Sequence, residues 1–141
     1  MSDAADAPVY RTGRLFDHVH LRVSDLEASK RFYSAALDVL GLGPLNEGPG
    51  YFQFDELFVS TDGPPTAHVH LAFQTPDRAT VDRWHEAVLA AGGRDNGGPG
   101  ERHYHPGYYA AFALDPDGNN IEAVNHGPAT RSVEAVEFRP A

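Results

Sequence analysis

Hydrophobic and polar positions alternate along residues 16–25, near the start of the chain. Side chains of a β-strand point to its two faces in turn, so Val19, Leu21 and Val23 share one face. The other face is polar and cationic, and carries His18, His20 and Arg22. Imidazole and guanidinium groups are buried only where partners satisfy them. The pattern therefore predicts a strand that packs on a core with one face, while the other face requires either hydrogen-bonding partners or a water-filled cleft.

The same pattern returns at residues 67–77. Here Val69, Leu71 and Phe73 share one face, whereas His68 and His70 lie on the other. His18 stands seven residues before Asp25, and His70 stands seven before Asp77. The spacing predicts that the chain consists of two similar halves and that His70 is the counterpart of His18. In an alternative register, His68 takes that place.

A helical period follows each of these strands. Ser24 and Glu27 form a capping box, which predicts that the first helix begins directly after Ser24. Gly41 should end this helix. Its apolar stripe consists of Leu26, Phe32, Tyr33, Ala36, Leu37 and Leu40. The second helix is expected to have Thr75 as N-cap and Pro76 at its first position, and to end at Gly92. Its stripe consists of Val81, Trp84, Val88 and Ala91.

Short strands complete each half. Residues 45–47 predict one, residues 51–60 predict either one bent strand or two short ones, and residues 61–65 form a proline-rich linker. In the second half, residues 94–106 are expected to be a loop. A hairpin follows, with strands over 108–114 and 120–125. The last strand places Glu122 between apolar neighbours, where a charge requires a partner or a ligand.

Composition narrows the chemistry. The chain has 141 residues, no cysteine and a formal net charge of −9. Any metal must therefore be held by histidine and carboxylate, and nucleic acid is an unfavourable partner because binding it normally requires a basic surface. No apolar run reaches the length of a membrane span, and residues 1–10 lack the pattern of a signal peptide. We expect a cytoplasmic protein without membrane contact.

Four motifs together resemble the vicinal oxygen chelate superfamily, which includes glyoxalase I, bleomycin-resistance proteins, fosfomycin-resistance enzymes and extradiol dioxygenases. They are HVHLRVSDLEAS at 18–29, RFY at 31–33, LGL at 40–42 and DPDGNNIE at 115–122. The resemblance implies an α+β fold of two tandem βαβββ modules that form an open mixed sheet lining a cleft. Module one would span 14–62 and module two 66–126 of a single domain over 14–126. The flanking segments 1–13 and 127–141 are expected to be tails, the first of them flexible. Weak alternation over 133–138 leaves open an edge strand, or a segment that lies over a neighbour, in the second.

The resemblance also implies a metal site. By position, the ligands are His18, His70 and Glu122, with Glu56 as a candidate fourth ligand that a one-residue slip would replace with Asp55. Two imidazoles and a carboxylate form a triad that leaves coordination positions open to substrate. The cofactor would be one divalent ion of iron, manganese, nickel or zinc. For a lone histidine, the usual interpretation is a structural hydrogen bond instead.

Further side chains are candidates for the cleft. Tyr108 and His105 are candidate catalytic groups that move a proton. Candidate substrate contacts are His20, His68, Arg22, Phe54, Phe58, His103 and Tyr109. The loop aromatics could equally pack a glycine-rich surface, and Arg22 could simply pair with a carboxylate such as Asp25.

The leading hypothesis is a metal-dependent enzyme of the glyoxalase or dioxygenase type, acting on a small oxygenated substrate that chelates the ion. The rival is a metal-free protein that sequesters a cationic aromatic drug, which the acidic balance and the aromatic residues favour. A homodimer is expected in either case. A fold that hosts many functions does not decide between them.

Overall fold

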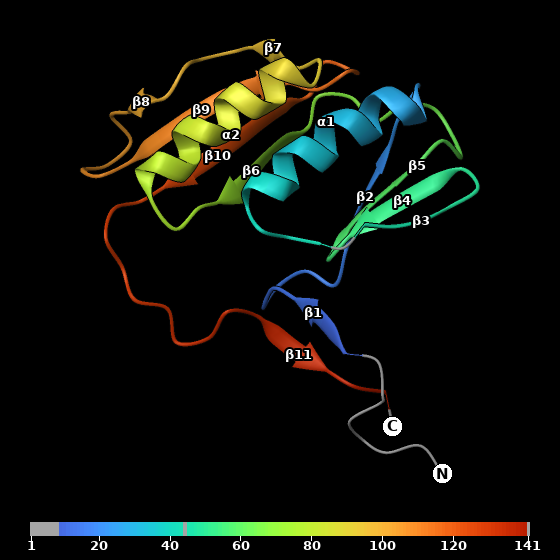
Figure 1. Ribbon diagram of the computed structural model, residues 1–141, viewed down its shortest axis with the longest axis horizontal. Helices are drawn as coiled ribbons and strands as arrows, with labels where there is room; N and C mark the ends of the chain where they lie inside the picture. Colours follow the sequence, from blue (N-terminus) through green and yellow to red (C-terminus); the bar gives the residue numbers. More distant parts are fainter. Residues whose placement is uncertain (1–8, 44, 141) are drawn as a thin grey trace.

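The computed structural model of the protein describes residues 9–43 and 45–140, and within them it contains two helices and eleven strands (Figure 1). The helices are α1 (Leu26–Val39) and α2 (Arg78–Ala90). The strands are β1 (Tyr10–Thr12), β2 (Val19–Arg22), β3 (Asn46–Gly48), β4 (Tyr51–Phe54), β5 (Leu57–Ser60), β6 (His70–Gln74), β7 (Arg94–Asp95), β8 (Gly100–Glu101), β9 (Tyr109–Leu114), β10 (Asn120–Asn125) and β11 (Val136–Phe138).

Two mixed sheets form the body of the molecule, one from each half of the chain. The first has the strand order β2-β5-β4-β3, with β2 and β5 parallel. The second has the order β6-β10-β9-β7, with β6 and β10 parallel and β8 also paired to β9. Each sheet receives its helix after its first strand. The predicted α+β fold of two similar modules is confirmed.

The helices begin one or two residues later than the capping patterns predict. Asp25, not Ser24, is the N-cap of α1 and accepts a hydrogen bond from the backbone N–H of Ala28 at 3.1 Å. Asp77, not Thr75, caps α2 and accepts from the N–H of Thr80 at 2.8 Å. A carboxylate is at least as good a cap as a hydroxyl, which explains the shift. The Ser24 hydroxyl instead donates to Asp117 at 2.6 Å, which ties module one to module two.

The core lies between the helices and the sheets. The two helices pack against each other, and α2 covers β9 and β10 (Figure 1). The largest side chains with no exposure are aromatic: Phe32, Tyr33, Phe52 and Trp84. They are joined by smaller residues from every strand face that alternation predicted to be apolar, including Leu21 and Ile121. Burying these faces leaves the histidine-bearing faces of both sheets outside the core.

The less regular segments differ in detail from expectation. Residues 51–60 form two strands, β4 and β5, because Asp55 adopts a left-handed backbone with φ 45° at the turn between them. Segment 94–106, expected to be a loop, contributes the two short strands β7 and β8 to the edge of the second sheet. Neither helix in the described part combines the length and hydrophobicity that crossing a bilayer requires.

The two predicted tails each contain a strand. β1 and β11 pair in antiparallel fashion, with Thr12 opposite Val136, and form a ribbon apart from both sheets (Figure 1). Residues 1–8, predicted to be flexible, lie outside the described residues.

A buried hydrogen bond joins α1 to the hairpin turn of module two. The hydroxyl of Tyr33 donates to Oδ2 of Asp115 at 2.5 Å. The other oxygen of Asp115 accepts the backbone N–H groups of Asp117 and Asn119, at 3.0 and 2.9 Å. Burial raises the pKa of Tyr33 well above its usual value, with a further contribution from the Asp115 charge. The phenol therefore remains a donor to the carboxylate at every physiological pH.

We expect Tyr33→Phe to lower the free energy of unfolding by about 1.5–3 kcal/mol, because it removes a donor from a carboxylate that cannot reach water. Urea denaturation at neutral pH measures the change. Tyr104→Phe is the matched control, since Tyr104 is 62% exposed. Equal stability of the two variants would contradict the prediction.

Candidate functional site

His70 and Glu122 meet on the open face of the second sheet. His70 opens β6 and Glu122 lies in the middle of β10, and the parallel register places Asn120 opposite His70. Glu122 is two residues beyond Asn120, so it projects from the same face. The Nε2 of His70 lies 2.7 Å from Oε1 of Glu122. The carboxylate is 1% exposed, whereas the imidazole is 54% exposed, so the pair is a buried acid reached from solvent through a histidine.

Tyr108 occupies the second oxygen of this carboxylate. Its hydroxyl donates a hydrogen bond to Oε2 of Glu122 from the segment that leads into β9. Burial raises the pKa of Tyr108 to about 12, and the hydrogen bond to Glu122 adds to the effect. At neutral pH Tyr108 therefore holds its proton. Glu122 is satisfied on both sides, which accounts for a charge among the apolar residues of β10.

The donor set of this pair fits a divalent metal ion. An imidazole nitrogen and a carboxylate oxygen that face each other at hydrogen-bond distance require only small side-chain movements to share an ion. The His70 imidazole is half-exposed, so the ion would keep positions open to substrate. The hydrogen bond between His70 and Glu122 is the contact that such an ion would replace.

The other predicted ligands do not join this pair within the chain. His18 precedes β2 in the first sheet, is 60% exposed, and has its Nδ1 2.7 Å from the carboxylate of the adjacent Asp17. Glu56 lines a cavity of about 470 Å³ together with Asp55, Thr75 and Arg131. In residues 9–43 and 45–140, no three histidine or acidic side chains gather closely enough to hold a metal.

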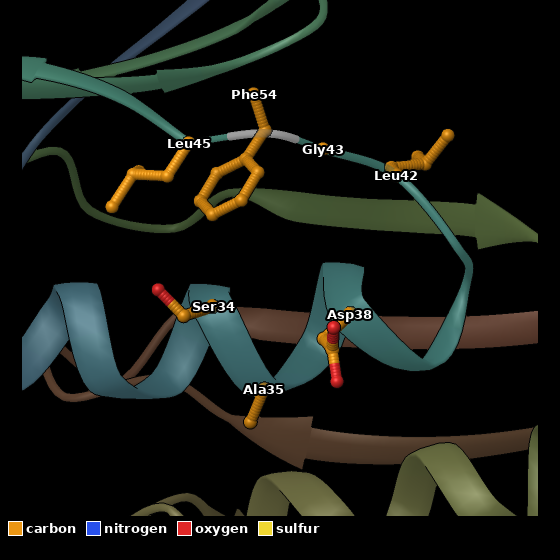
Figure 2. Close-up of a pocket in the computed structure, with 7 residues that line it drawn as sticks. All are labelled: Ser34, Ala35, Asp38, Leu42, Gly43, Leu45 and Phe54. Carbon is orange, nitrogen blue, oxygen red and sulfur yellow. The ribbon is translucent and has the colours of Figure 1, made fainter.

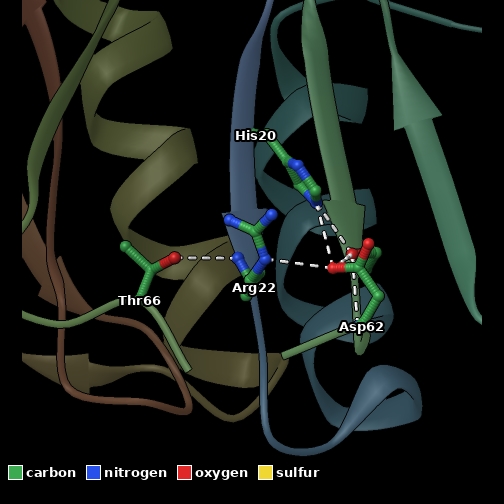
Figure 3. A network of polar contacts seen from close by, with 5 residues as sticks. His20, Arg22, Asp62 and Thr66 are labelled. Atoms are coloured by element: carbon green, nitrogen blue, oxygen red, sulfur yellow. Dashed lines mark hydrogen bonds and ion pairs between the residues drawn. The ribbon is translucent and has the colours of Figure 1, made fainter. Parts of the chain in front are cut away.

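A polar network occupies the open face of the first sheet (Figure 3). The Nε of Arg22 donates to Oδ1 of Asp62 at 3.0 Å, and the Nε2 of His20 lies 2.7 Å from Oγ of Ser60. The backbone of Arg22 is fixed as well, since its N–H donates to Oγ1 of Thr66 at 2.8 Å. Arg22 thus pairs with Asp62, not Asp25, because Asp25 is occupied as a helix cap. Ser60 and Asp62 were missed from sequence, although alternation places Ser60 on the same face as Phe58.

These residues do not form a nucleophilic triad. The Ser60 hydroxyl donates to Oδ1 of Asp62 at 2.8 Å, so its proton is directed to the acid and not to an imidazole base. The hydrogen bond from Ser60 lowers the pKa of Asp62, which makes that carboxylate a weaker base. In a Ser-His-Asp site the histidine accepts the serine proton. The network is therefore suited to holding the cleft wall and binding polar groups.

Aromatic rings surround Tyr108 at the edge of the candidate site. Tyr104, His105 and His126 all contact its ring edge-on, with centroid separations of 4.9, 5.4 and 5.1 Å. His105 and His126 are stacked, and their Nε2 and Nδ1 atoms lie 2.8 Å apart. His103 contacts Tyr104 at 5.0 Å and so belongs to the outer part of the cluster. His126 was missed from sequence; its place directly after the Glu122 strand was the only signal.

The remaining predicted contacts fall in different places. Phe58 lies on the open face of the first sheet, stacked on Tyr51 at 5.4 Å. Tyr109 points to the helix side, where its hydroxyl donates to Asp82 at 2.6 Å, because adjacent strand residues face opposite ways. His68 is exposed just before β6, with φ 61°. The structure therefore brings Phe58, but neither Tyr109 nor His68, to an open sheet face.

Phe54 belongs to the core side of its sheet. It is 5% exposed and borders a hollow of about 420 Å³ next to α1 (Figure 2). The other residues around this hollow are Ser34, Ala35, Asp38, Leu42, Gly43 and Leu45. Gln53 precedes Phe54 on β4 and points to the opposite face, where its register partner on β5 is Phe58. Phe54 therefore does not reach the open face on which a substrate contact was predicted.

Two similar modules, each with a helix after its first strand, make up the fold, and a buried carboxylate and an imidazole meet on the open face of the second sheet. The family model for the Glyoxalase/Bleomycin resistance protein/Dioxygenase superfamily matches residues 15–123. The chain belongs to this superfamily.

Individual relatives agree with this assignment. The chain is 32% identical over 126 residues to the Bacillus subtilis (strain 168) protein YqjT, which is described as uncharacterized, and the match covers 76% of this chain and 95% of YqjT. A glyoxalase/bleomycin resistance protein from Albidiferax ferrireducens T118 has 34% identity and a TM-score of 0.67, covering 79% of this chain and 98% of its own. A lactoylglutathione lyase from Agrobacterium tumefaciens, at 24% identity and a TM-score of 0.53, shares the fold over 77% of this chain and 91% of its own.

The environment of Tyr108 makes a spectroscopic prediction. Because its pKa is raised to about 12, Tyr108 should remain protonated at pH 10, where an ordinary tyrosine is about half ionised. We expect the difference in phenolate absorbance between the wild type and Tyr108→Phe, both metal-free, to be absent at pH 10 and to appear only well above it. Glu122→Gln should bring that ionisation to lower pH, because the charge that opposes it is gone. A Tyr108 phenolate at pH 10 would contradict the geometry.

Proposed function

We propose that the protein is a metal-dependent enzyme of the glyoxalase or dioxygenase type, which acts on a small oxygenated substrate that chelates a divalent ion through neighbouring oxygens. The observation that carries the proposal is the chain of contacts from His70 through Glu122 to Tyr108 on an open sheet face. A buried carboxylate that is reached through a half-exposed imidazole is a costly arrangement for a purely structural role.

His70 through Nε2 and Glu122 through Oε1 would hold the ion, which belongs to the group of iron, manganese, nickel and zinc. When bound, it would supply electrophilic stabilisation of negative charge on a substrate oxygen. Tyr108 keeps its proton on Oη at neutral pH and lies against the same carboxylate, so it is the candidate general acid. His105 borders the Tyr108 ring and is the second candidate for moving a proton.

The third ligand would come from His18 of a second copy. Two features support this step. His18 is exposed, and in the described residues its ring is hydrogen-bonded only to the adjacent Asp17. In the same residues, no third ligand approaches His70 and Glu122. Two-fold symmetry would then create two equivalent sites per homodimer. Glu56 stays a candidate fourth ligand, from the same module as His18.

The first sheet would supply substrate contacts in that arrangement. His20, Arg22 and Phe58 lie on its open face, and the His20 ring contacts Phe58 edge-on at 4.9 Å. Arg22 would bind an acidic substrate group while Asp62 keeps its guanidinium in place. We place this activity in the cytoplasm, as the sequence predicts.

A mixing experiment tests the shared site. His18→Ala and His70→Ala should each abolish stoichiometric metal binding, measured by elemental analysis of chelated and reloaded protein. After the two variants are unfolded together and refolded, metal binding should return to about one quarter of the sites, because half of the dimers are mixed and each mixed dimer keeps one intact site.

The outcomes are distinct. Metal retained in full by His70→Ala, or by Glu122→Ala, would overturn the ligand assignment. Loss in each variant without recovery in the mixture, while wild type carried through the same refolding binds metal again, would overturn the shared site. His85→Ala is the matched control. His85 lies on α2 and its Nε2 is 2.9 Å from Oδ1 of Asp95 on β7, away from the proposed ligands, so this variant should bind metal as the wild type does.

The alternative function is sequestration of a cationic aromatic drug without metal. The stacked pair of Tyr51 and Phe58 and the cluster around Tyr108 offer aromatic faces, and the net charge of −9 favours a cation. Isothermal titration of metal-free protein with cationic glycopeptide drugs distinguishes the two functions. Tight binding that Phe58→Ala weakens would favour sequestration, and no binding would favour the enzyme.

A further inference from the structure

Arg102 is a cation at the second sheet that no carboxylate of the described residues neutralises. It directly follows β8, and its side chain is partly buried. Its guanidinium donates only to backbone carbonyls in that part of the chain, from Nη2 to Gly98 at 2.7 Å and from Nη1 to Glu101 at 3.3 Å. The chain has 20 acidic residues against 11 lysines and arginines, so carboxylates are not scarce. Arg102 therefore keeps its positive charge and has N–H donors to spare.

A glycine-rich turn, residues 97–100, fits closely around this guanidinium. A Cβ atom on Gly97 would lie 3.3 Å from Nη2 of Arg102, and one on Gly100 would lie 3.2 Å from Nη1. Gly97 also has φ 139°, a backbone conformation that favours glycine. The turn can approach the guanidinium this closely because these positions lack side chains. The charge is thus held in place before any ligand arrives, which lowers the ordering cost of binding.

The held charge lies beside the candidate site, on the open face of the second sheet. The Cζ of Arg102 is 5.4 Å from the ring centroid of Phe112. Phe112 is opposite Glu122 in the pairing of β9 with β10, so the two share a face, and the Phe112 ring lies 6.0 Å from that of His70. The charge also acts on Tyr108, because burial raises the pKa of that phenol and Arg102 opposes the rise.

Other arginines of the fold already have a counter-ion. The Nε of Arg22 lies 3.0 Å from Oδ1 of Asp62, and the Nη2 of Arg78 lies 3.1 Å from Oε1 of Glu101. An anion that approaches either of these must share the guanidinium with a carboxylate. At Arg102 it meets no such competitor.

We infer that Arg102 binds an oxyanion group of the ligand, a carboxylate or a phosphate, on the open face of the second sheet. A guanidinium presents paired N–H donors that match two oxygens of such a group, and charge-assisted hydrogen bonds are stronger than neutral ones. In making this group part of the substrate, the inference rests on the proposed function. The substrate would be an acid whose chelating oxygens approach His70 and Glu122 while its oxyanion meets Arg102. Arg102 would then determine specificity and take no part in the chemistry.

Oxyanion binding to the metal-free protein tests the inference. The full chain is stripped of metal, freed of chelator by dialysis, and titrated with inorganic phosphate or with malonate while sodium chloride holds the ionic strength constant. NMR of ¹⁵N-labelled protein follows the Nε–H signal of Arg102 and the backbone amides of Gly97 and Gly98. We expect saturable shifts, and Arg102→Gln should weaken binding at least about tenfold, because hydrogen bonds to a charged group are lost. The anion that binds more tightly identifies the class of acidic group.

Two further variants serve as controls. Arg78 also lies over an aromatic ring, that of Tyr109 at 4.7 Å, but it is paired with Glu101, so Arg78→Gln should leave oxyanion binding unchanged. Arg102→Lys keeps the charge and loses the planar fork, so its affinity should lie between those of the wild type and Arg102→Gln. Far-UV circular dichroism should be native in all variants.

Three outcomes would overturn the inference. They are a wild type without saturable shifts for either anion, an Arg102→Gln variant that binds as tightly as the wild type, and an Arg102→Lys variant that binds no better than Arg102→Gln. In the last case the charge would not be what holds the anion.

Metal binding, measured on the same proteins, separates this inference from the proposed function. Arg102 is not a proposed metal ligand, so Arg102→Gln should load metal as the wild type does. Oxyanion binding that depends on Arg102, in a protein that takes up no metal, would support the inference and remove the metal site. Metal uptake that His70→Ala abolishes, together with oxyanion binding that does not depend on Arg102, would do the reverse.

Discussion

The burial of one carboxylate organises the functional half of this structure. Glu122 lies on a central strand with almost no exposure, and an ionised group in that position must be paired. His70 satisfies one oxygen from the neighbouring parallel strand, and Tyr108 satisfies the other from the chain that enters β9. The register of β6, β9 and β10 is therefore also the register of the candidate site, and a slip of one residue would separate all three groups.

A second constraint decides how the two modules are arranged. The helices pack against each other, and the Tyr33 hydroxyl fixes α1 to Asp115 at the hairpin turn of module two. These contacts make one body of the two sheets while leaving both histidine-bearing faces outside its core. The same packing leaves His18 away from His70 and Glu122, which is why the proposed metal site draws on a second copy.

Sequence predicted the elements of the fold better than their limits. Periodicity identified both helices and the buried stripe from Phe32 to Leu37, because the hydrophobic effect acts on patterns that are local. It placed both N-caps too early, since Ser24 and Thr75 compete with nearby aspartates that a local pattern cannot rank. It predicted no strand at β1 and left an edge strand open at 133–138, where β11 lies. It could not predict that the two strands pair, because that contact joins residues more than a hundred positions apart.

The sequence by itself determined that two strands with histidines on one face recur in the two halves, and that any metal would have to be held by histidine and carboxylate because the chain has no cysteine. Alternation put His70 on the face opposite the apolar side chains of its strand, and it placed Glu122 among apolar neighbours, where a charge requires a partner. Only the tertiary structure decided that these two residues meet, that Tyr108 joins them while Tyr109 turns to α2, and that Arg22 pairs with Asp62. Which groups meet depends on strand register and on how the modules pack, and both are set by contacts between distant parts of the chain.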